Sequence, residues 1–339
     1  MATLKDIATD LNVSQALVSR VLSNRMGTSR VSEKTRIAIL EKAKELDFTP
    51  NPNAIALRKG IKGVVAVFLH GIGTEGSDID RRFLQAIGKK LSENSCNMML
   101  EFFEHKTEFI QACNPSLLNK VDGLIVAGFP HQELIENLVS LEKEGLPVVS
   151  AFQAEKKTTP GICNFTVDYV KQTYITTAHL LGIGCTRIAH FRTVKDRYDG
   201  YQLAHEHFDT PLDPALCIYT PTFSHSAGYQ AMEHLLESGL EFDAICAQSD
   251  GQALGAIQKL ALSGVPRSKW PKMTGVDNSP IAKYYSLVPL TSSTVEMKQT
   301  GELSVDAILK KIKGEPVEGK IVAPRLIIRE STQPSLNEG

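Results

Sequence analysis

Residues 3–22 read TLKDIATDLNVSQALVSRVL, and this stretch decides how the N-terminal region folds. Apolar residues recur three and four positions apart in each half, as on one face of a short helix. Thr3 and Ser14 stand where an N-cap hydroxyl begins a helix, and Asp6 completes a capping pattern at the first. Asn12 tolerates a left-handed turn between the two segments. Two short helices joined by so tight a turn predict a helix-turn-helix.

The outward face of the second helix carries residues that suit DNA bases. They lie near its N-terminus, where a recognition helix meets base edges in the major groove. Arg20 offers a bidentate donor to guanine, Gln15 can pair with adenine, and Ala16 has a methyl group for thymine. The backbone N–H of Ser14 suits a phosphate. The alternative interpretation of this face, which also includes Ser19, is an ordinary solvated surface.

A third helix and a tether are expected next. Ser32 caps the helix, and the tether, residues 48–60, reads FTPNPNAIALRKG. Pro50 blocks continuation of the third helix, whereas Pro52 suits the first turn of a new one. The new helix has room for about two turns, and helices of that length are marginal alone, so it forms only when something holds it. The core side of the third helix is expected to carry Ile37, Ile39, Leu40, Ala43 and Leu46.

Charge divides the chain unevenly. Residues 1–60 carry ten Lys or Arg and six Asp or Glu, a net charge of +4, while the whole chain of 339 residues has a net charge of -1. The other 279 residues therefore carry -5. A small basic head on a mildly acidic body indicates that the head meets an anionic partner.

The composition excludes several protein classes. Hydrophobic residues make up 42% and charged residues 22%, which is globular rather than disordered or fibrous composition. The longest apolar runs, such as residues 64–69, are far shorter than the ~18 residues that cross a bilayer. The N-terminal residues lack the pattern of a secretory signal, and six scattered Cys form no C-x-x-C pair. We expect a cytoplasmic protein with reduced thiols and no membrane partner.

From Gly63 onward, short apolar runs alternate with amphipathic stretches, which indicates parallel sheets covered by helices on both faces. A linker-like patch, residues 153–161, separates the first four strands from the rest. We therefore expect two doubly wound lobes with a ligand cleft at the carboxyl ends of their strands. The expected strands are Val64–Leu69, Asn97–Phe103, Gly123–Ala127, Pro147–Ala151, Arg187–Phe191, Leu216–Tyr219, Ala244–Ala247 and Lys272–Gly275. The expected helices include Arg82–Asn94, Gln132–Glu144, Tyr169–Gly182, Ala227–Gly239 and Ala253–Gly264.

The head resembles the headpiece and hinge of LacI/GalR (lac-repressor type) transcription regulators. The spacing T-x-x-D-I-A...V-S...V-S-R-V-L-x-N...V-S-x-x-T-R...L-x-F-x-P-N-x-x-A-x-x-L is met from Thr3 to Leu57. The resemblance implies a homodimer on a pseudo-palindromic double-stranded operator, with paired hinge helices in the minor groove and Leu57 as the wedge between base pairs. One departure is Ile55, where many members carry Arg. The resemblance implies DNA contacts from Thr3, Ser14, Gln15, Ala16, Ser19, Arg20, Asn51, Ala54, Leu57 and Arg58.

The resemblance continues along the body in blocks such as QSDGQALGA at 248–256, TGVDN at 274–278 and PRLIIREST at 324–332. It implies a periplasmic-binding-protein-like fold of two α/β lobes, in which late segments return to the first lobe. The expected division is a headpiece at 1–48, a hinge helix and linker at 49–61, an effector-binding and dimerisation domain at 62–332, and a tail at 333–339. Within the domain, the expected lobes are 62–160 with 292–322, and 161–291 with 323–332.

The resemblance also implies an effector site for a small polar metabolite of the sugar or sugar-derivative class. Arg197 matches the family's ligand-gripping arginine, and Phe223 matches an aromatic that stacks on sugar. Ser249 is the polar residue directly before Asp250. For Asp250 itself, a helix N-cap is favoured over a ligand contact. Asp277 is a carboxylate ligand or a structural residue. Two departures are apolar, since Phe152 replaces an aspartate of the type member and Val295 a frequent Gln or Arg, so no particular sugar is implied.

Other motifs carry less weight. Gly71-Ile72-Gly73-Thr74-Glu75-Gly76 formally matches a dinucleotide-binding loop and suggests a NAD-dependent oxidoreductase as the alternative function. Acidic residues within and after this loop oppose a pyrophosphate. A solute-binding protein without DNA is a third possibility. No metal cluster, cofactor or catalytic nucleophile is expected, and we expect a ligand-responsive, nucleoid-associated regulator, a repressor rather than an enzyme.

Overall fold

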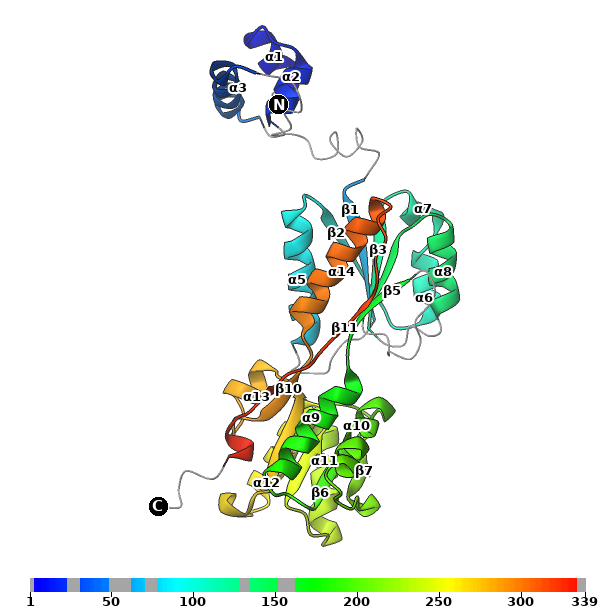
Figure 1. The fold of residues 1–339 in the computed structure, drawn as a ribbon, viewed down its shortest axis with the longest axis vertical. Coiled ribbons are helices and arrows are strands. Elements are labelled where there is room, and N and C mark those ends of the chain that lie inside the picture. The colour runs from blue at the N-terminus through cyan, green and yellow to red at the C-terminus, as the bar shows by residue number, and fades with distance from the viewer. Residues whose placement is uncertain are drawn as a thin grey trace. The chain divides into compact units, whose positions relative to one another are not determined.

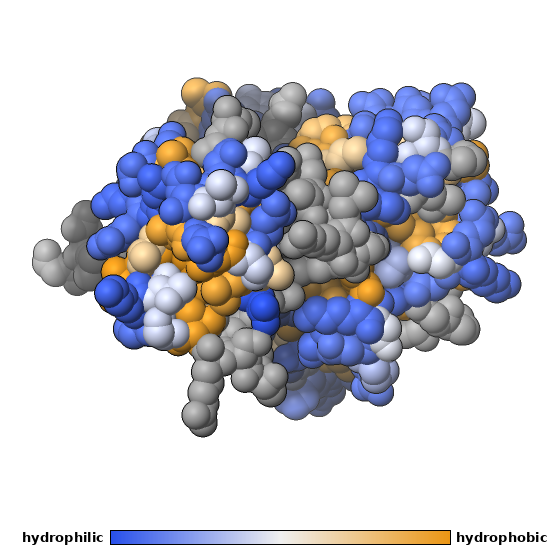
Figure 2. Space-filling model, turned by 90° about the horizontal axis from the view of Figure 1, so that it is seen from above, coloured by the Kyte–Doolittle hydropathy of each residue, from blue (hydrophilic) through white to orange (hydrophobic). Residues whose placement is uncertain are grey.

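The computed structural model describes residues 3–22, 31–48, 62–70, 78–128, 134–151 and 162–333. The chain divides into two compact units, Met1–Gly63 and Val64–Gly339. We describe each unit by itself (Figure 1). Figure 2 shows hydrophilic residues interleaved with smaller hydrophobic areas on the face it presents. In the parts of the chain just given, no helix has both the length and the apolar character needed to cross a membrane.

The first unit contains the expected helix-turn-helix: α1 (Leu4–Asp10), α2 (Gln15–Leu22) and α3 (Glu33–Glu45). The amide of Asp6 donates to the Thr3 hydroxyl, and the Asp6 carboxylate accepts from the Thr3 amide at 2.7 Å, which completes the capping box. Asn12 takes the left-handed turn with φ 51°. The Ser14 hydroxyl accepts from the amide of Leu17 at 3.2 Å. The small core consists of Ile7, Ala8, Val18, Val21, Ile39 and Ala43.

Two residues expected in this core lie outside it. Ile37 is 47% exposed and Leu40 is 43% exposed, whereas Ile39 and Ala43 are buried. Each helical residue turns the side chain by about 100°, so Ile39, Ala43 and Leu46 share one stripe. Leu40 falls on the flank of that stripe and Ile37 on the opposite side. The expectation for these two residues was wrong.

In the second unit, the first lobe is built on a six-stranded parallel sheet in the order β11-β5-β4-β3-β1-β2. Alternate residues of β1 point to opposite faces. Val65 and Val67 pack on the side of α5 and α14, whereas Ala66 and Phe68 pack on the side of α6 and α8. The strands are β1 (Val64–His70), β2 (Asn97–Phe103), β3 (Gly123–Ala127), β4 (Val148–Ala151), β5 (Cys163–Val167) and β11 (Lys320–Val322). The helices are α5 (Ile79–Glu93), α6 (Lys106–Ala112), α7 (Pro115–Leu118), α8 (Ile135–Lys143) and α14 (Met297–Ile312).

The second lobe repeats this design in the strand order β12-β10-β9-β8-β6-β7, with β12 antiparallel and the others parallel. Its strands are β6 (Ile188–Arg192), β7 (Cys217–Tyr219), β8 (Ala244–Ala247), β9 (Lys272–Asp277), β10 (Thr291–Thr294) and β12 (Leu326–Ile327). Its helices are α9 (Tyr169–Gly182), α10 (Lys195–His207), α11 (His225–Ser238), α12 (Asp250–Leu262) and α13 (Pro280–Tyr284). Three short 3₁₀ helices, η2 (Pro214–Leu216), η3 (Arg267–Lys269) and η4 (Glu330–Thr332), complete the described elements.

Helices α9 and α10 of this lobe pack with their backbones in contact. A Cβ added to Gly200 of α10 would lie 2.1 Å from the carbonyl oxygen of Val170 on α9. No side chain fits in that space. The glycine therefore lets the two helix backbones touch, and it fixes the helix that carries Arg197 three residues earlier.

The expected lobe boundaries need two corrections. Residues 163–167 were assigned to the second lobe and no strand was expected there, but they form β5, whose Cys163 pairs with Val149 in the first sheet. Residues 153–161, which lie outside the described residues, therefore join two strands of one sheet rather than two lobes. Residues 292–294 were assigned to the first lobe and no strand was expected there, but they belong to β10, whose Ser292 pairs with Gly275 in the second sheet. The chain passes between the lobes after Val167, after Thr294 and after Val322. At each of these points, the next helix or strand along the chain belongs to the other lobe.

Candidate effector site and DNA-reading helix

The residues expected to read DNA share the outer face of α2. Gln15, Ala16 and Arg20 are exposed, Ser19 is half-buried, and Val18 on the inner face is fully buried. The Arg20 Nε donates to the carbonyl oxygen of Ala16 at 3.2 Å. The core residues of α2 thus turn the polar face outward. Thr3 and Ser14 are helix caps. The hinge candidates Asn51, Ala54, Leu57 and Arg58 lie outside the described residues.

Arg197 is the centre of the candidate effector site in the second lobe. It projects from the first turn of α10 and is only 7% exposed. Its guanidinium carbon lies 5.0 Å from the centre of the Phe223 ring and 5.7 Å from that of Tyr169, within the range of cation–π attraction. Its Nη1 donates to the carbonyl oxygen of Gln248. Its Nε is buried and has no hydrogen-bond partner among the described residues.

Ser249 joins Phe223 to α12. Its hydroxyl donates to the carbonyl oxygen of Phe223 at 2.7 Å and accepts from the amide of Gln252 at 3.1 Å. Ser249 is therefore the N-cap of α12, a role that the sequence had suggested for Asp250. That expectation was wrong by one residue, because Asp250 is the first helical residue and its carboxylate turns toward β9 and β10.

Asp277 ends β9 in an unusual backbone conformation. It has φ 117° and the next residue, Asn278, has φ 48°. Few L-residues adopt positive φ, so the surroundings must hold this turn in place. The Asp277 side chain is only 5% exposed, and burial raises its pKa although the positive charge of Arg197 lowers it. A buried carboxyl group, on which the charge of Arg197 acts, thus lies at the carboxyl end of β9.

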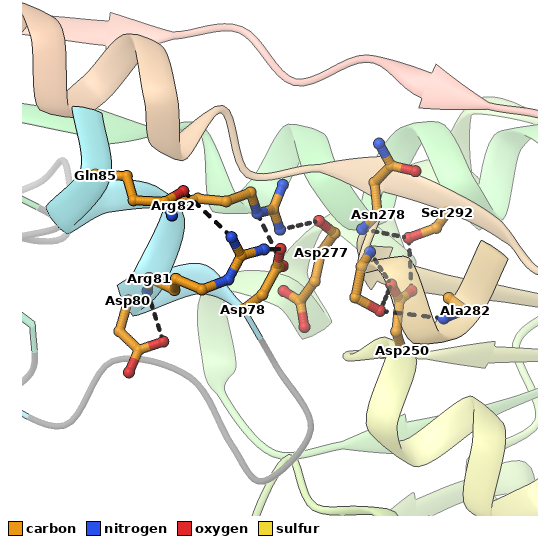
Figure 3. Close-up of polar contacts among 11 residues, drawn as sticks. Asp78, Asp80, Arg81, Arg82, Gln85, Asp250, Asp277, Asn278, Ala282 and Ser292 are labelled. Atoms are coloured by element: carbon orange, nitrogen blue, oxygen red, sulfur yellow. Dashed lines mark hydrogen bonds and ion pairs between the residues drawn. The ribbon is translucent and has the colours of Figure 1, made fainter. Parts of the chain in front are cut away.

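The turn that carries Asp277 is fixed by Asp250 (Figure 3). The Asp250 carboxylate accepts from the amide and hydroxyl of Ser279 at 2.7 and 2.8 Å, and from the hydroxyl of Ser292 at 2.6 Å. The amide of Asn278 donates to that same Ser292 hydroxyl at 2.9 Å. Burial raises the pKa of Asp250, and these hydrogen bonds oppose the rise. One buried carboxylate therefore ties α12, α13 and β10 to the candidate site.

Gln248 fixes the start of α10. Its Oε1 accepts from the amides of Thr193 and Val194 at 3.0 and 2.8 Å. Its Nε2 lies 3.0 Å from Nε2 of His190, whose Nδ1 lies 2.9 Å from the carbonyl oxygen of Cys246. Because a carbonyl only accepts, the imidazole proton sits on Nδ1 and its Nε2 accepts. Burial lowers the pKa of His190 to about 3, so the ring stays neutral and this network persists near pH 7.

The structure thus brings four of the five candidate effector residues to one region: Arg197, Phe223, Ser249 and Asp277. The fifth, Phe152, lies outside the described residues, as do Gly71, Gly73 and Gly76 of the formal dinucleotide motif. Val295 is buried in the core of the first lobe, next to Met297. Sequence reasoning missed Tyr169, Gln248 as the anchor of α10, and Arg82 with Asp78. In the described ranges, no three His, Cys, Asp or Glu side chains gather as metal ligands.

Comparisons with known proteins agree with this architecture. Residues 3–51 match the model of bacterial regulatory proteins of the lacI family, and residues 177–332 match a periplasmic binding protein-like domain. The HTH-type transcriptional regulator DegA of Bacillus subtilis is 27% identical over 351 residues, which cover 98% of each chain. A lac repressor dimer bound to operator and the anti-inducer ONPF has a TM-score of 0.76 at 22% identity, with 98% of this chain and 99% of that chain covered.

A complex of the transcriptional regulator CelR with cellobiose has a TM-score of 0.71 at 23% identity, with 98% of this chain and all of that chain covered. The solved structures share the fold with this chain. DegA, which is aligned with this chain over 98% of its own length, is a transcriptional regulator. Neither kind of match supports the nicotinamide-enzyme or the transport hypothesis. With a lacI-family helix-turn-helix domain, a periplasmic binding protein-like domain and a transcriptional regulator matched along nearly the whole chain, this protein is a LacI-type transcriptional regulator.

Proposed function

We propose that this regulator is a homodimeric repressor whose grip on an operator is set by a sugar or sugar derivative bound in the second lobe. The observation that carries the effector part is the buried guanidinium of Arg197, which lies over Phe223 and whose positive charge acts on the buried carboxyl of Asp277. A buried cation beside a carboxyl group and an aromatic ring has the elements of a polyol site. The proposal gives the site a binding role without a chemical step.

Each group has a defined task in this proposal. The guanidinium donates to ligand hydroxyls in a fixed fork, and the carboxyl of Asp277 accepts from a hydroxyl. The Phe223 ring packs on the apolar C–H face of a sugar. Ser249 holds the Phe223 backbone at the N-terminus of α12. The cellobiose bound by the structurally similar CelR supports a sugar as the effector class.

On the DNA side, α2 enters the major groove with Arg20, Gln15 and Ala16 toward base edges. One head binds each half-site of a pseudo-palindrome, as expected for a two-fold symmetric dimer. Leu57 acts as the wedge that bends the operator, and the neighbouring hinge contacts come from Asn51, Ala54 and Arg58. The operator-bound lac repressor dimer, which shares the fold, supports this arrangement. The regulator acts in the cytoplasm, at the chromosome.

The effector acts by differential affinity. If the ligand binds one relative orientation of the lobes better than another, it shifts the population toward that orientation. The first strand, β1, follows the expected hinge directly in the chain, so a change in the first lobe reaches the hinge residues. The coupling free energy is reciprocal, because DNA that favours one orientation changes the affinity for effector by the same factor.

DNA binding by the full chain is the decisive experiment. Duplexes selected from random sequence are titrated with the full chain and with a truncated chain that begins at Gly63, at several salt concentrations. We expect tight, steeply salt-dependent binding only by the full chain. Binding that survives removal of residues 1–62, or that lacks a salt slope, contradicts the proposal. A thermal-shift screen of sugars, sugar acids and sugar phosphates tests the effector class.

A further inference from the structure

One side chain of the first lobe reaches the candidate effector site in the second. Arg82 projects from the first turn of α5, and its Nη2 donates to the backbone oxygen of Asp277 at 3.1 Å (Figure 3). Its Nε lies 2.8 Å from the carboxylate of Asp78, the N-cap residue of the same helix. Arg82 therefore bridges its own helix and the turn that ends β9.

The bridge is sheltered from solvent. The Arg82 side chain is 26% exposed and that of Asp78 is 13% exposed. Arg81, the preceding residue, also pairs with Asp78 at 2.8 Å, but its side chain is 57% exposed and hydrogen-bonds to Gln85 of its own helix. The two arginines thus share the carboxylate of Asp78. Among the described residues, Arg82 hydrogen-bonds to the second lobe and Arg81 does not.

The hydrogen bond from Arg82 reaches a turn with a strained backbone conformation. Asp277 and Asn278 both have positive φ, and such residues persist only when the surroundings over-determine them. From within the second lobe, the Asp250 carboxylate and Ser292 hold the amides of Ser279 and Asn278. From the other lobe, Arg82 holds the Asp277 carbonyl. The direction of the Asp277 carboxyl depends on both anchors.

We propose that Arg82 is a positioning residue of the effector site, by which the first lobe holds Asp277 in its ligand-facing conformation and senses a ligand bound there. The proposal rests on the proposed function of Asp277. A ligand that engages this carboxyl moves or tightens the turn, and the guanidinium transmits the change to α5. Phe83 and Ile87 of α5 pack in one core with Val65 and Val67 of β1, the strand that follows the expected hinge.

Hydrogen exchange of the unliganded full chain, followed by mass spectrometry, tests the positioning role. We expect Arg82→Gln to speed exchange of the amides of Asn278 and Ser279 about tenfold, because a hydrogen bond from a charged group is lost. Asp78→Asn should give a smaller increase in the exchange rate, since the Arg82 guanidinium can still donate to the Asp277 carbonyl. Arg82→Lys should restore most of the protection, because an ammonium group can donate to the same carbonyl.

Arg81→Gln is the matched control, since it removes an arginine from the same carboxylate without touching the second lobe. Its exchange at Asn278 and Ser279 should equal that of the unaltered chain. Equal effects of Arg81→Gln and Arg82→Gln would overturn the proposal. So would faster exchange spread over β8 and β3, or a failure of Arg82→Lys to restore protection.

The sensing role has its own measurement. The probe is the sugar that gives the largest thermal shift in a panel containing cellobiose and ribose. We expect Arg82→Gln to weaken its binding about tenfold and to reduce sugar-dependent protection of α5 amides, while Arg81→Gln changes neither. Unchanged affinity with unchanged protection of α5 overturns the sensing role. If no sugar shifts the unaltered chain, the proposed effector class fails, whereas the exchange result for unliganded Arg82→Gln stands by itself.

Discussion

The hydroxyl of Ser292 donates to the Asp250 carboxylate at 2.6 Å, so strand β10 and the first residue of α12 are joined through a buried charge. Asp250 is 1% exposed and accepts from two donors of Ser279 as well. Such a carboxylate is difficult to replace, because each of its donors is buried with it. This pair therefore offers a direct measure of how firmly the effector turn is held.

Asp250→Asn should lower the free energy of unfolding by about 1–3 kcal/mol, because the new amide group faces donors that it cannot satisfy. Urea unfolding of the full chain measures the change. Asp199→Asn is the control, since Asp199 pairs with Lys195 on the surface of one helix, and its loss should cost less than about 0.5 kcal/mol. Equal effects would show that the buried network adds nothing to stability.

Arg197→Ala should abolish the effector-induced thermal shift while DNA affinity without effector is unchanged. The substitution removes the donors proposed for the ligand and leaves the head intact. Arg187→Ala is the control, because Arg187 lies at the opposite end of β6 and pairs with Asp213. A normal shift in Arg197→Ala would remove this residue from the site.

Arg20→Ala should cost about 1–3 kcal/mol of discrimination at a single operator position, as expected for a bidentate contact to one base. Fluorescence anisotropy with a set of single-base operator variants measures it. Arg36→Ala is compared in parallel, since Arg36 pairs with Glu33 on α3. A uniform loss over all duplexes would make Arg20 a phosphate contact instead.

The raised pKa of Asp277 predicts a stability that depends on pH. The group is protonated more readily in the folded chain than in the unfolded chain, where its pKa is about 3.9. The contribution of Asp277 to the free energy of unfolding is therefore fully present below pH ~3.9 and is lost as the pH rises through the raised pKa of the folded chain. Asp277→Asn should remove this decline and make the chain more stable near pH 8, as measured by urea unfolding at several pH values. An unaltered pH profile would mean that Asp277 ionises normally.

Gly200→Ala should lower the free energy of unfolding by about 1–3 kcal/mol or more, because its Cβ would meet the Val170 carbonyl at 2.1 Å. Gly88→Ala on α5 is the matched substitution, since the nearest atom there is a flexible Met98 methyl group at 3.9 Å. That change should be neutral or stabilising, because alanine favours a helix more than glycine does. Similar losses at both positions would contradict the close approach of α9 and α10.

Local sequence predicted the buried strands well and the polar ones poorly. Strands β3 and β8 have the expected bounds, since a strand buried on both faces reads as a continuous apolar run. Strand β10 reads Thr-Ser-Ser-Thr and gave no such signal. It is buried because Ser292 hydrogen-bonds to Asp250 and Thr291 to Thr332, partners that only the folded chain brings near.

The candidate site depended on resemblance for the same reason. Arg197 lies on α10, Phe223 in the loop before α11 and Asp277 at the end of β9, so their proximity follows from sheet order rather than from local spacing. Arg82 comes from the other lobe, 195 positions before Asp277, and lies in an ordinary amphipathic helix. Nothing in its neighbourhood distinguishes it from Arg81. The burial of one and the exposure of the other appear only when both lobes are in place.

The repeated passage of the chain between the lobes bears on synthesis. The hydrophobic core of the first lobe includes Val305 and Ile308 of α14, and β11 closes its sheet at residues 320–322. While the ribosome is still adding these residues, the earlier part of the lobe lacks a helix and an edge strand. Neither lobe can mature as an independent nascent domain before β11 and β12, which pair in the two sheets, have been synthesised. A chain truncated before α14 should therefore be a substrate for chaperones and proteases rather than a stable half.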